Sequence, residues 1–145
     1  RQQLTERIAV CLGGRAAEQL ALGDISTGAG NDLQKASAIA RNMVTRYGMS
    51  EKVGNVVFDS GHDEVFIGRT MGHSRGYSEA VAAQIDEEVR ALVDGAYSRC
   101  QEILTAQRDK LDAVAHYLLE HETMEREAFL TVFGETAPAE TGADA

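Results

Sequence analysis

Residues 26–32 read Ser-Thr-Gly-Ala-Gly-Asn-Asp and separate two stretches with a helical sequence pattern. A turn rich in small residues that ends in Asn-Asp at a helix start can hold a carboxylate rigidly at the mouth of a cleft. That arrangement suits a metal ligand, and Asp32 is the candidate. On the residues alone, Asp32 is more often a helix-start acid that satisfies free backbone N–H groups and the helix macrodipole. The turn by itself therefore leaves both roles open.

The stretch before this turn is predicted to be a helix that ends near Leu22-Gly23. Its apolar residues recur at three- and four-residue steps, as in an amphipathic helix: Leu4, Ile8, Cys11, Leu12, Ala16 and Leu20. Gly13-Gly14 lies inside it at a cost of roughly 1 kcal/mol per glycine relative to alanine. Such a pair usually means that the backbone of a neighbouring element approaches closely.

A second helix is predicted to begin at Asn31 or Asp32 and to end at Tyr47-Gly48. Its expected inward residues are Leu33, Ala36, Ile39, Ala40, Met43 and Val44. Residues 49–76 then change character, with two short β-prone runs at 53–58 and 65–68. These runs either pair as a small hairpin or lie extended on the helices, and the sequence does not decide. Residues 68–76 lack periodicity, and we expect a mobile loop there.

The second half of the sequence is predicted to be helical up to Gly134. Ser78 is the expected N-cap of a long helix that continues to about Gln107, and a further helix follows around residues 111–119. Thr123 is the expected N-cap of a short last helix. We expect residues 1–134 to form one helical domain and 135–145 a disordered acidic tail with too few apolar side chains to order itself. The predicted fold is mostly α, a bundle-like set of helices with a small extended or β segment between the second and third helices.

Composition limits the classes of function. The chain has 145 residues, 43% hydrophobic and 26% charged, as in ordinary globular domains with a substantial core. A net charge of −9 would repel nucleic-acid phosphates and anionic lipid surfaces, so direct binding to either is not expected. No apolar run approaches the roughly 18 residues of a membrane span, so any anchor would lie in segments outside this sequence. Cys11 and Cys100 lack Cys-x-x-Cys spacing and are predicted to be buried thiols.

Several polar features have simple structural interpretations. Arg15 and Glu18 have the i, i+3 spacing of a surface ion pair, which is the simplest role for both. His62 and His73 lie in polar, glycine-flanked sequence and are expected to be solvated. The acidic run 86–88 is predicted to be the solvated face of the long helix. Ser26 is neither a nucleophile nor part of a phosphate loop, because no Gly-x-Ser-x-Gly elbow and no Walker lysine is present.

Three segments in order carry a family resemblance: Gly-Gly-Arg-Ala-Ala-Glu at 13–18, Ser-Thr-Gly-Ala-Gly-Asn-Asp at 26–32, and Ala-Arg-Asn-Met-Val-Thr-Arg-Tyr-Gly-Met-Ser at 40–50. The sequence resembles the C-terminal peptidase domain of FtsH-type, membrane-anchored, ATP-dependent zinc proteases. The resemblance runs from Leu4 to about Phe133 and is most specific in the first fifty residues. It implies that Asp32 is the third zinc ligand. It also implies that Glu18 lies close to the zinc site, where it would orient a ligand.

That family takes its other two zinc ligands and its catalytic glutamate from a His-Glu-x-x-His helix, because two histidines one turn apart face the same metal. The sequence contains no such motif. Its histidines are His62, His73, His116 and His121. The last two are five residues apart and would point in different directions on a helix. We therefore expect a fragment that begins downstream of the motif, with no catalytic residue among these 145.

For the complete protein, the resemblance implies an AAA+ ATPase module that uses ATP and Mg²⁺ to unfold polypeptides and thread them into a homohexameric peptidase ring. Zinc in that ring would polarise the scissile carbonyl and activate water. The expected location is the cytoplasmic face of a bacterial inner membrane, with a mitochondrial or chloroplast membrane as the alternative. The present chain would contribute Asp32 and much of the helical scaffold.

A second interpretation belongs to a different class, in which the same scaffold is a non-catalytic helical assembly module. A His-Glu-x-x-His helix upstream of Arg1 favours the enzyme, and its replacement favours the module. For the isolated chain we expect weak zinc binding, no proteolysis, and a monomeric or weakly associated state. The sequence does not indicate which polypeptides are substrates.

Overall fold

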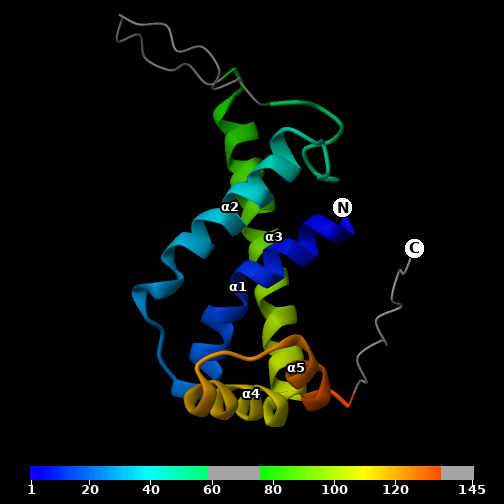
Figure 1. Cartoon of the computed structure of the whole chain (residues 1–145). Coiled ribbons are helices and arrows are strands. Elements are labelled where there is room, and N and C mark those ends of the chain that lie inside the picture. Colours follow the sequence, from blue (N-terminus) through cyan, green and yellow to red (C-terminus); the bar gives the residue numbers. More distant parts are fainter. Residues whose placement is uncertain (59–75, 135–145) are drawn as a thin grey trace, which may run out of the picture. The chain divides into compact units, whose positions relative to one another are not determined.

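The computed structural model describes residues 1–58 and 76–134 (Figure 1). These residues contain five α-helices, one 3-10 turn and an isolated bridge between Ser50 and Gly54, without a β-sheet. The predicted mostly-α fold is confirmed. The chain divides into two compact units, Arg1–Glu102 and Ile103–Ala145. Several predictions fall outside the described residues: the β-prone run at 65–68, the loop at 68–75, His62, His73 and the acidic tail at 135–145.

Helix α1 spans Gln2–Leu22 and ends where the sequence pattern predicted. Gly23 follows in the left-handed conformation, with φ of 68°, and its N–H donates to the carbonyl of Gln19. Such a backbone conformation closes a helix at little cost only when the residue is glycine. The chain then passes through the 3-10 turn η1 (Thr27–Ala29) into helix α2 (Gly30–Thr45). Helix α2 thus begins and ends slightly earlier than predicted.

The core of the first unit is built by α1, α2 and the part of α3 (Glu79–Ala106) that belongs to that unit. Figure 1 shows α3 passing behind α1 and α2. The largest fully buried side chains are Ile8, Leu12, Met43, Val44 and Ile85. Each contributes about 1.5–3 kcal/mol by leaving water. Of the other residues expected to face inward on α2, Ala36 and Ala40 are buried, whereas Leu33 and Ile39 are only partly buried.

Polar contacts also join these helices. The Cys100 thiol on α3 donates to the carbonyl of Ala9 at 2.9 Å, and Arg41 on α2 donates to Asp86 on α3 at 3.1 Å. Cys100 is buried as predicted, but Cys11 is only partly buried. Burial raises the pKa of the Cys100 thiol. Both cysteines are therefore reduced side chains of the scaffold rather than members of a disulfide.

The start of α3 agrees with the prediction, whereas the expectation for Gly13-Gly14 does not hold in the described residues. The Ser78 hydroxyl accepts the N–H of Val81 at 3.3 Å, which is the expected N-cap. A Cβ atom added at either of the paired glycines of α1 would meet no atom within 4 Å. The predicted close approach of a neighbouring backbone is thus absent from residues 1–58 and 76–134.

The second unit contains α4 (Arg108–His121) and α5 (Arg126–Val132). The prediction that Thr123 caps the last helix is wrong. Glu122 has a positive φ of 61° and the N–H of Thr123 donates to the carbonyl of His121, so a turn occupies this position. Helix α5 begins three residues later, after Glu125, without a side-chain cap. None of the helices in the two described ranges has the length and apolar content needed to cross a membrane.

Candidate metal-ligand site

Asp32 lies in the first turn of α2, as the sequence predicted, but it does not cap the helix. The N-cap residue is Ala29, and no side chain caps that end. Lys35, one turn further along, donates to Asp32 Oδ1 at 3.1 Å, and the Asp32 side chain is 49% exposed. The predicted hydrogen bonds from free backbone N–H groups to the Asp32 carboxylate are therefore absent among the described contacts. Of the two helix-start roles predicted for Asp32, only the favourable interaction with the helix macrodipole remains.

Glu18 on α1 holds the turn that leads to Asp32. Its Oε1 accepts the hydroxyl hydrogen of Ser26 at 2.8 Å, and its Oε2 accepts the backbone N–H of Ser26 at 3.1 Å. These two hydrogen bonds lower the pKa of Glu18, and the nearby charge of Arg15 lowers it further. The predicted Arg15–Glu18 ion pair is not formed among the described residues, and both carboxylate oxygens bind Ser26 instead.

The hydrogen bonds continue from Ser26 into α2. Ser26 has an extended backbone, with φ of −94° and ψ of 172°, and its Oγ accepts the N–H of Gly28 at 3.2 Å. A Cβ atom at Gly28 would lie 3.3 Å from that hydroxyl oxygen, so glycine keeps the turn uncrowded. The N–H of Gly30, the first residue of α2, donates to the carbonyl of Thr27. Hydrogen bonds therefore run from α1 to the helix that carries Asp32.

The residues around Asp32 do not form a complete zinc site within the described part of the chain. A carboxylate is a suitable oxygen ligand for zinc, but catalytic sites take about three protein ligands and structural sites about four. No group of three or more His, Cys, Asp or Glu side chains within residues 1–58 and 76–134 could hold a metal ion. The Glu18 carboxylate is occupied by Ser26. Both histidines of α4 direct Nδ1 to backbone carbonyls of their own helix.

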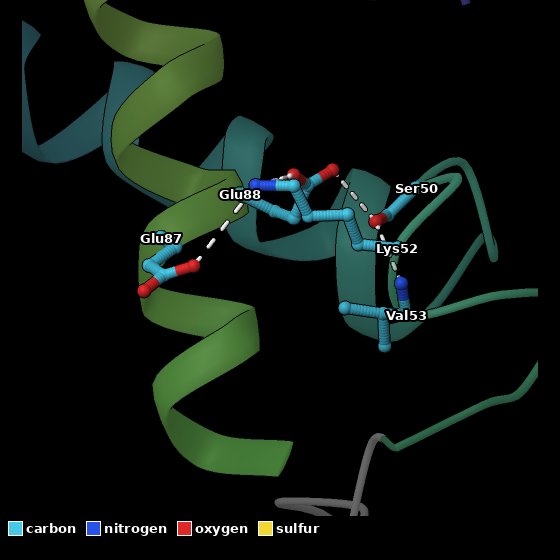
Figure 2. Close-up of polar contacts among 5 residues, drawn as sticks. All are labelled: Ser50, Lys52, Val53, Glu87 and Glu88. Carbon is cyan, nitrogen blue, oxygen red and sulfur yellow. Dashed lines mark hydrogen bonds and ion pairs between the residues drawn. The ribbon is translucent and has the colours of Figure 1, made fainter. Parts of the chain in front are cut away.

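A second polar cluster was not foreseen from the sequence. Glu88 on α3 accepts the Ser50 hydroxyl at 2.7 Å, while the Ser50 Oγ accepts the N–H of Val53 at 3.1 Å (Figure 2). Lys52 Nζ lies 3.5 Å from Glu88 and 3.9 Å from Glu87. The prediction of a solvated acidic face is wrong for Glu88, whose side chain is only 17% exposed, because the turn after α2 covers it. It holds for Asp86 and Glu87, at 65% and 69% exposure.

This second cluster fastens the turn after α2 to α3. It does not form part of a metal-binding site among the described residues. Ser50 and Glu88 are 38 residues apart, and no local pattern in the sequence signals their contact. The nearby surface depression of about 550 Å³ is lined by side chains of both charges, Lys52, Asp86, Glu87, Arg90 and Asp94. The Asp32 turn therefore remains the better candidate for chemistry.

The profile of peptidase family M41 matches residues 1–132. The chain is 48% identical over 133 residues to the ATP-dependent zinc metalloprotease FtsH of Ruminiclostridium cellulolyticum, covering 92% of this chain and 22% of that protein. It is 50% identical over 131 residues to FtsH 2 of Alkaliphilus metalliredigens, covering 90% and 19% respectively. For the Mycobacterium bovis FtsH, the identity is 45% over 135 residues. The chain thus spans about a fifth of the length of these curated relatives.

Proposed function

The chain belongs to peptidase family M41, and we propose that it forms part of the peptidase domain of an ATP-dependent zinc metalloprotease in which Asp32 binds the zinc. The main observation in support of this proposal is that relatives named as zinc metalloproteases match more than nine-tenths of this chain, with Asp32 inside the matched region. Asp32 stands half-exposed in the first turn of α2. Its oxygen atoms are of the type that zinc accepts.

The environment of Asp32 is compatible with metal binding. Its partner Lys35 is 56% exposed, and an ion pair of that kind contributes only about 0–1 kcal/mol. A metal ion can displace Lys35 at small cost. Glu18 would act by holding the turn that precedes α2, so its role is to orient a zinc ligand and not to bind the metal itself.

The remaining parts of the enzyme would come from outside these 145 residues. They include the other zinc ligands, the general base, and the AAA+ module that uses ATP and Mg²⁺. Bound zinc would supply a Lewis acid and an activated water. We extend the proposal to the complete protein as a homohexamer that degrades unfolded polypeptides at the cytoplasmic face of a bacterial inner membrane. A mitochondrial or chloroplast membrane is the alternative location.

The second candidate function is a non-catalytic assembly module on the same helical scaffold. The described residues contain no complete set of metal ligands. A protein in which the upstream His-Glu-x-x-His helix is replaced would keep this helical scaffold and lose catalysis. The two functions therefore differ in the chemistry of the complete protein and not in the fold of this region.

The deciding experiment is Asp32→Asn in the complete protein, assayed for zinc content, proteolysis and ATP hydrolysis. An amide is a neutral and much poorer zinc ligand, so we expect zinc and proteolysis to be lost while ATP hydrolysis persists. Asp109→Asn is the matched control, because Asp109 is also an acid in the first turn of a helix, α4. In the isolated chain, Asp32→Asn should change the free energy of unfolding by less than about 1 kcal/mol, since only a dipole and an exposed ion-pair contribution are lost. Near-normal zinc content and proteolysis in the complete variant would overturn the assignment.

A further inference from the structure

We propose that Ser26 is a positioning residue, which fixes the first turn of α2, and with it the Asp32 carboxylate, by bonding to Glu18 on α1. The inference rests on the proposed zinc-binding role of Asp32. Neither the family resemblance nor the names of the relatives assign a task to this serine. Its sequence context excludes a nucleophile, so its hydroxyl requires another explanation.

Ser26 makes three hydrogen bonds at once, one through its backbone N–H and two through its hydroxyl. Its N–H and its O–H both donate to Glu18, at 3.1 and 2.8 Å, and its Oγ accepts the N–H of Gly28 at 3.2 Å. Hydrogen bonds to an ionised carboxylate are about twice as strong as those between neutral groups. Ser26 thus ties the last turns of α1 to the residues that lead into α2.

Little else holds this connection in place. Residues 21–28 are all exposed, so little apolar burial fixes them, and Ile25, at 41% exposure, is the more covered of their two large apolar residues. Ala29 is the first buried residue after the turn, at 9% exposure. An exposed loop without buried anchors would sample many conformations. Asp24 accepts the neighbouring Ile25 N–H at 2.8 Å within this connection, and among the described contacts the hydrogen bonds of Ser26 are those that tie residues 24–27 to α1.

The restraint passes directly to the candidate ligand. Gly28 lies four residues before Asp32, and the Gly30 N–H closes onto Thr27 at the start of α2. A metal ligand must be held in position before the metal arrives, and groups that hold ligands in this way typically change metal affinity by about 10–100-fold. Ser26 acts through the backbone, and we expect an effect at or below the lower end of that range.

The test compares three serine variants of the complete protein by competition for zinc with a chelator. Ser26→Ala removes the hydroxyl, and we expect zinc affinity to fall about five- to tenfold. Ser26→Thr keeps the hydroxyl and suits the extended backbone, so zinc affinity should return to near the wild-type value. Ser37→Ala, at an exposed position of α2, is the matched control and should leave zinc affinity unchanged. Unfolding temperatures measured in parallel separate a loss of fold from a loss of zinc.

A double-mutant cycle with Glu18→Ala tests the specific partner. Because both residues belong to one set of hydrogen bonds, the two losses of zinc affinity should not add. In the isolated chain, amide hydrogen exchange at Ser26 and Gly28 should be slow and should accelerate in Glu18→Ala. If Ser26→Ala does not fold in the complete protein, Ser26→Thr and Glu18→Gln are compared instead. The zinc affinity of Glu18→Gln should then lie between those of the wild type and Glu18→Ala.

The outcomes separate this inference from the function on which it rests. If Asp32→Asn removes zinc while Ser26→Ala binds zinc as tightly as Ser37→Ala, the positioning role is wrong and the ligand assignment stands. If Asp32→Asn keeps its zinc, the ligand assignment itself is wrong. Additive losses in the double-mutant cycle would also overturn the positioning role.

Discussion

The role of the Glu18 side chain depends on the residue to which it binds. On a helix surface a glutamate three residues after an arginine normally forms a weak exposed ion pair. In this chain both carboxylate oxygens instead accept hydrogen bonds from Ser26, eight residues further along. These bonds favour the ionised carboxylate and hold the pKa of Glu18 below its usual value of 4.5.

A pH dependence of stability follows from that lowered pKa. The folded state binds the Glu18 proton less readily than the unfolded state, so the stabilisation is complete above the usual value of 4.5 and is lost as pH falls through the folded-state pKa. Glu18→Gln should lower the free energy of unfolding near neutral pH, and the difference from wild type should shrink below pH 4.5. Urea titrations at several pH values measure this. Glu120→Gln controls for the change in net charge, and a Glu18→Gln difference that stays constant with pH would contradict the prediction.

For single residues, the sequence predicted the position in a helix better than the hydrogen-bond or ion-pair partner. The motif and the helical pattern placed Glu18 on a helix and Asp32 at a helix start, and both placements hold. The predicted Arg15 partner of Glu18 and the predicted backbone partner of Asp32 were wrong, and the zinc role of Asp32 stays a prediction. Helical spacing indicates which residues share a face, but the path of the 23–29 connection decides that Ser26 reaches Glu18. That path depends on backbone angles that glycine-rich sequence leaves open.

At the scale of elements, glycines in a helix and in a turn should respond oppositely to the same change. Gly14→Ala in α1 should stabilise the isolated chain by about 0.5–1 kcal/mol, because an alanine Cβ there would meet no atom within 4 Å. Gly48→Ala should destabilise it by at least about 1 kcal/mol. Gly48 has φ of 58°, and an added Cβ would lie 3.2 Å from the Asn55 backbone. Urea unfolding measures both.

The outcome for Gly14 also tests the original expectation of a close neighbour. If Gly14→Ala destabilises the isolated chain, a segment outside the described residues must approach α1 there. In the complete protein the same substitution tests for packing by segments beyond these 145 residues. The sign of the effect, and not its size, separates an open helix face from a packed one.

The contact between Ser50 and Glu88 should contribute more to the free energy of unfolding than the neighbouring ion pair of Lys52 with Glu87. Ser50 is 5% exposed, and its hydroxyl holds the turn after α2 on α3 (Figure 2). Ser50→Ala leaves the Val53 N–H and the Glu88 carboxylate without that partner, and we expect a loss of about 1–2 kcal/mol in the free energy of unfolding. Glu87→Ala is the control, because its exposed contact with Lys52 at 3.9 Å should contribute less than about 0.5 kcal/mol. Equal losses in the two variants would contradict this ranking.

Helix positions were predictable because apolar residues recur with the helical period. The ends of the helices were less so. The pattern carried the second helix to Gly48, but the Met49 N–H turns back to the Met43 carbonyl and α2 ends at Thr45. Phe58 then donates its N–H to the Thr45 carbonyl, so the end of the β-prone run 53–58 is held by the end of α2, whereas the run at 65–68 lies outside the described residues. Such contacts depend on tertiary packing and leave no periodic signal.

At the scale of the whole molecule, the number of ligands determines the metal chemistry of the isolated chain. Zinc affinity grows with the number of protein ligands held in place before binding, and this chain offers one family-matched carboxylate. Its net charge of −9 will attract zinc ions weakly and without a defined site. A useful assay must therefore separate saturable binding from general attraction to an acidic surface.

We predict that the isolated chain binds zinc weakly, cleaves no casein, and remains monomeric or weakly associated. Calorimetry should show no saturable one-to-one zinc binding in the wild type, and Asp32→Asn should give the same weak signal, because one carboxylate without further ligands barely distinguishes itself from the other acids. Light scattering at micromolar concentration should show no stable hexamer, since the resemblance places ring formation in the complete protein. Tight one-to-one binding that disappears when Asp32 and two histidines are substituted would show that this chain assembles a zinc site by itself. The view that the other ligands lie in another part of the protein would then be wrong.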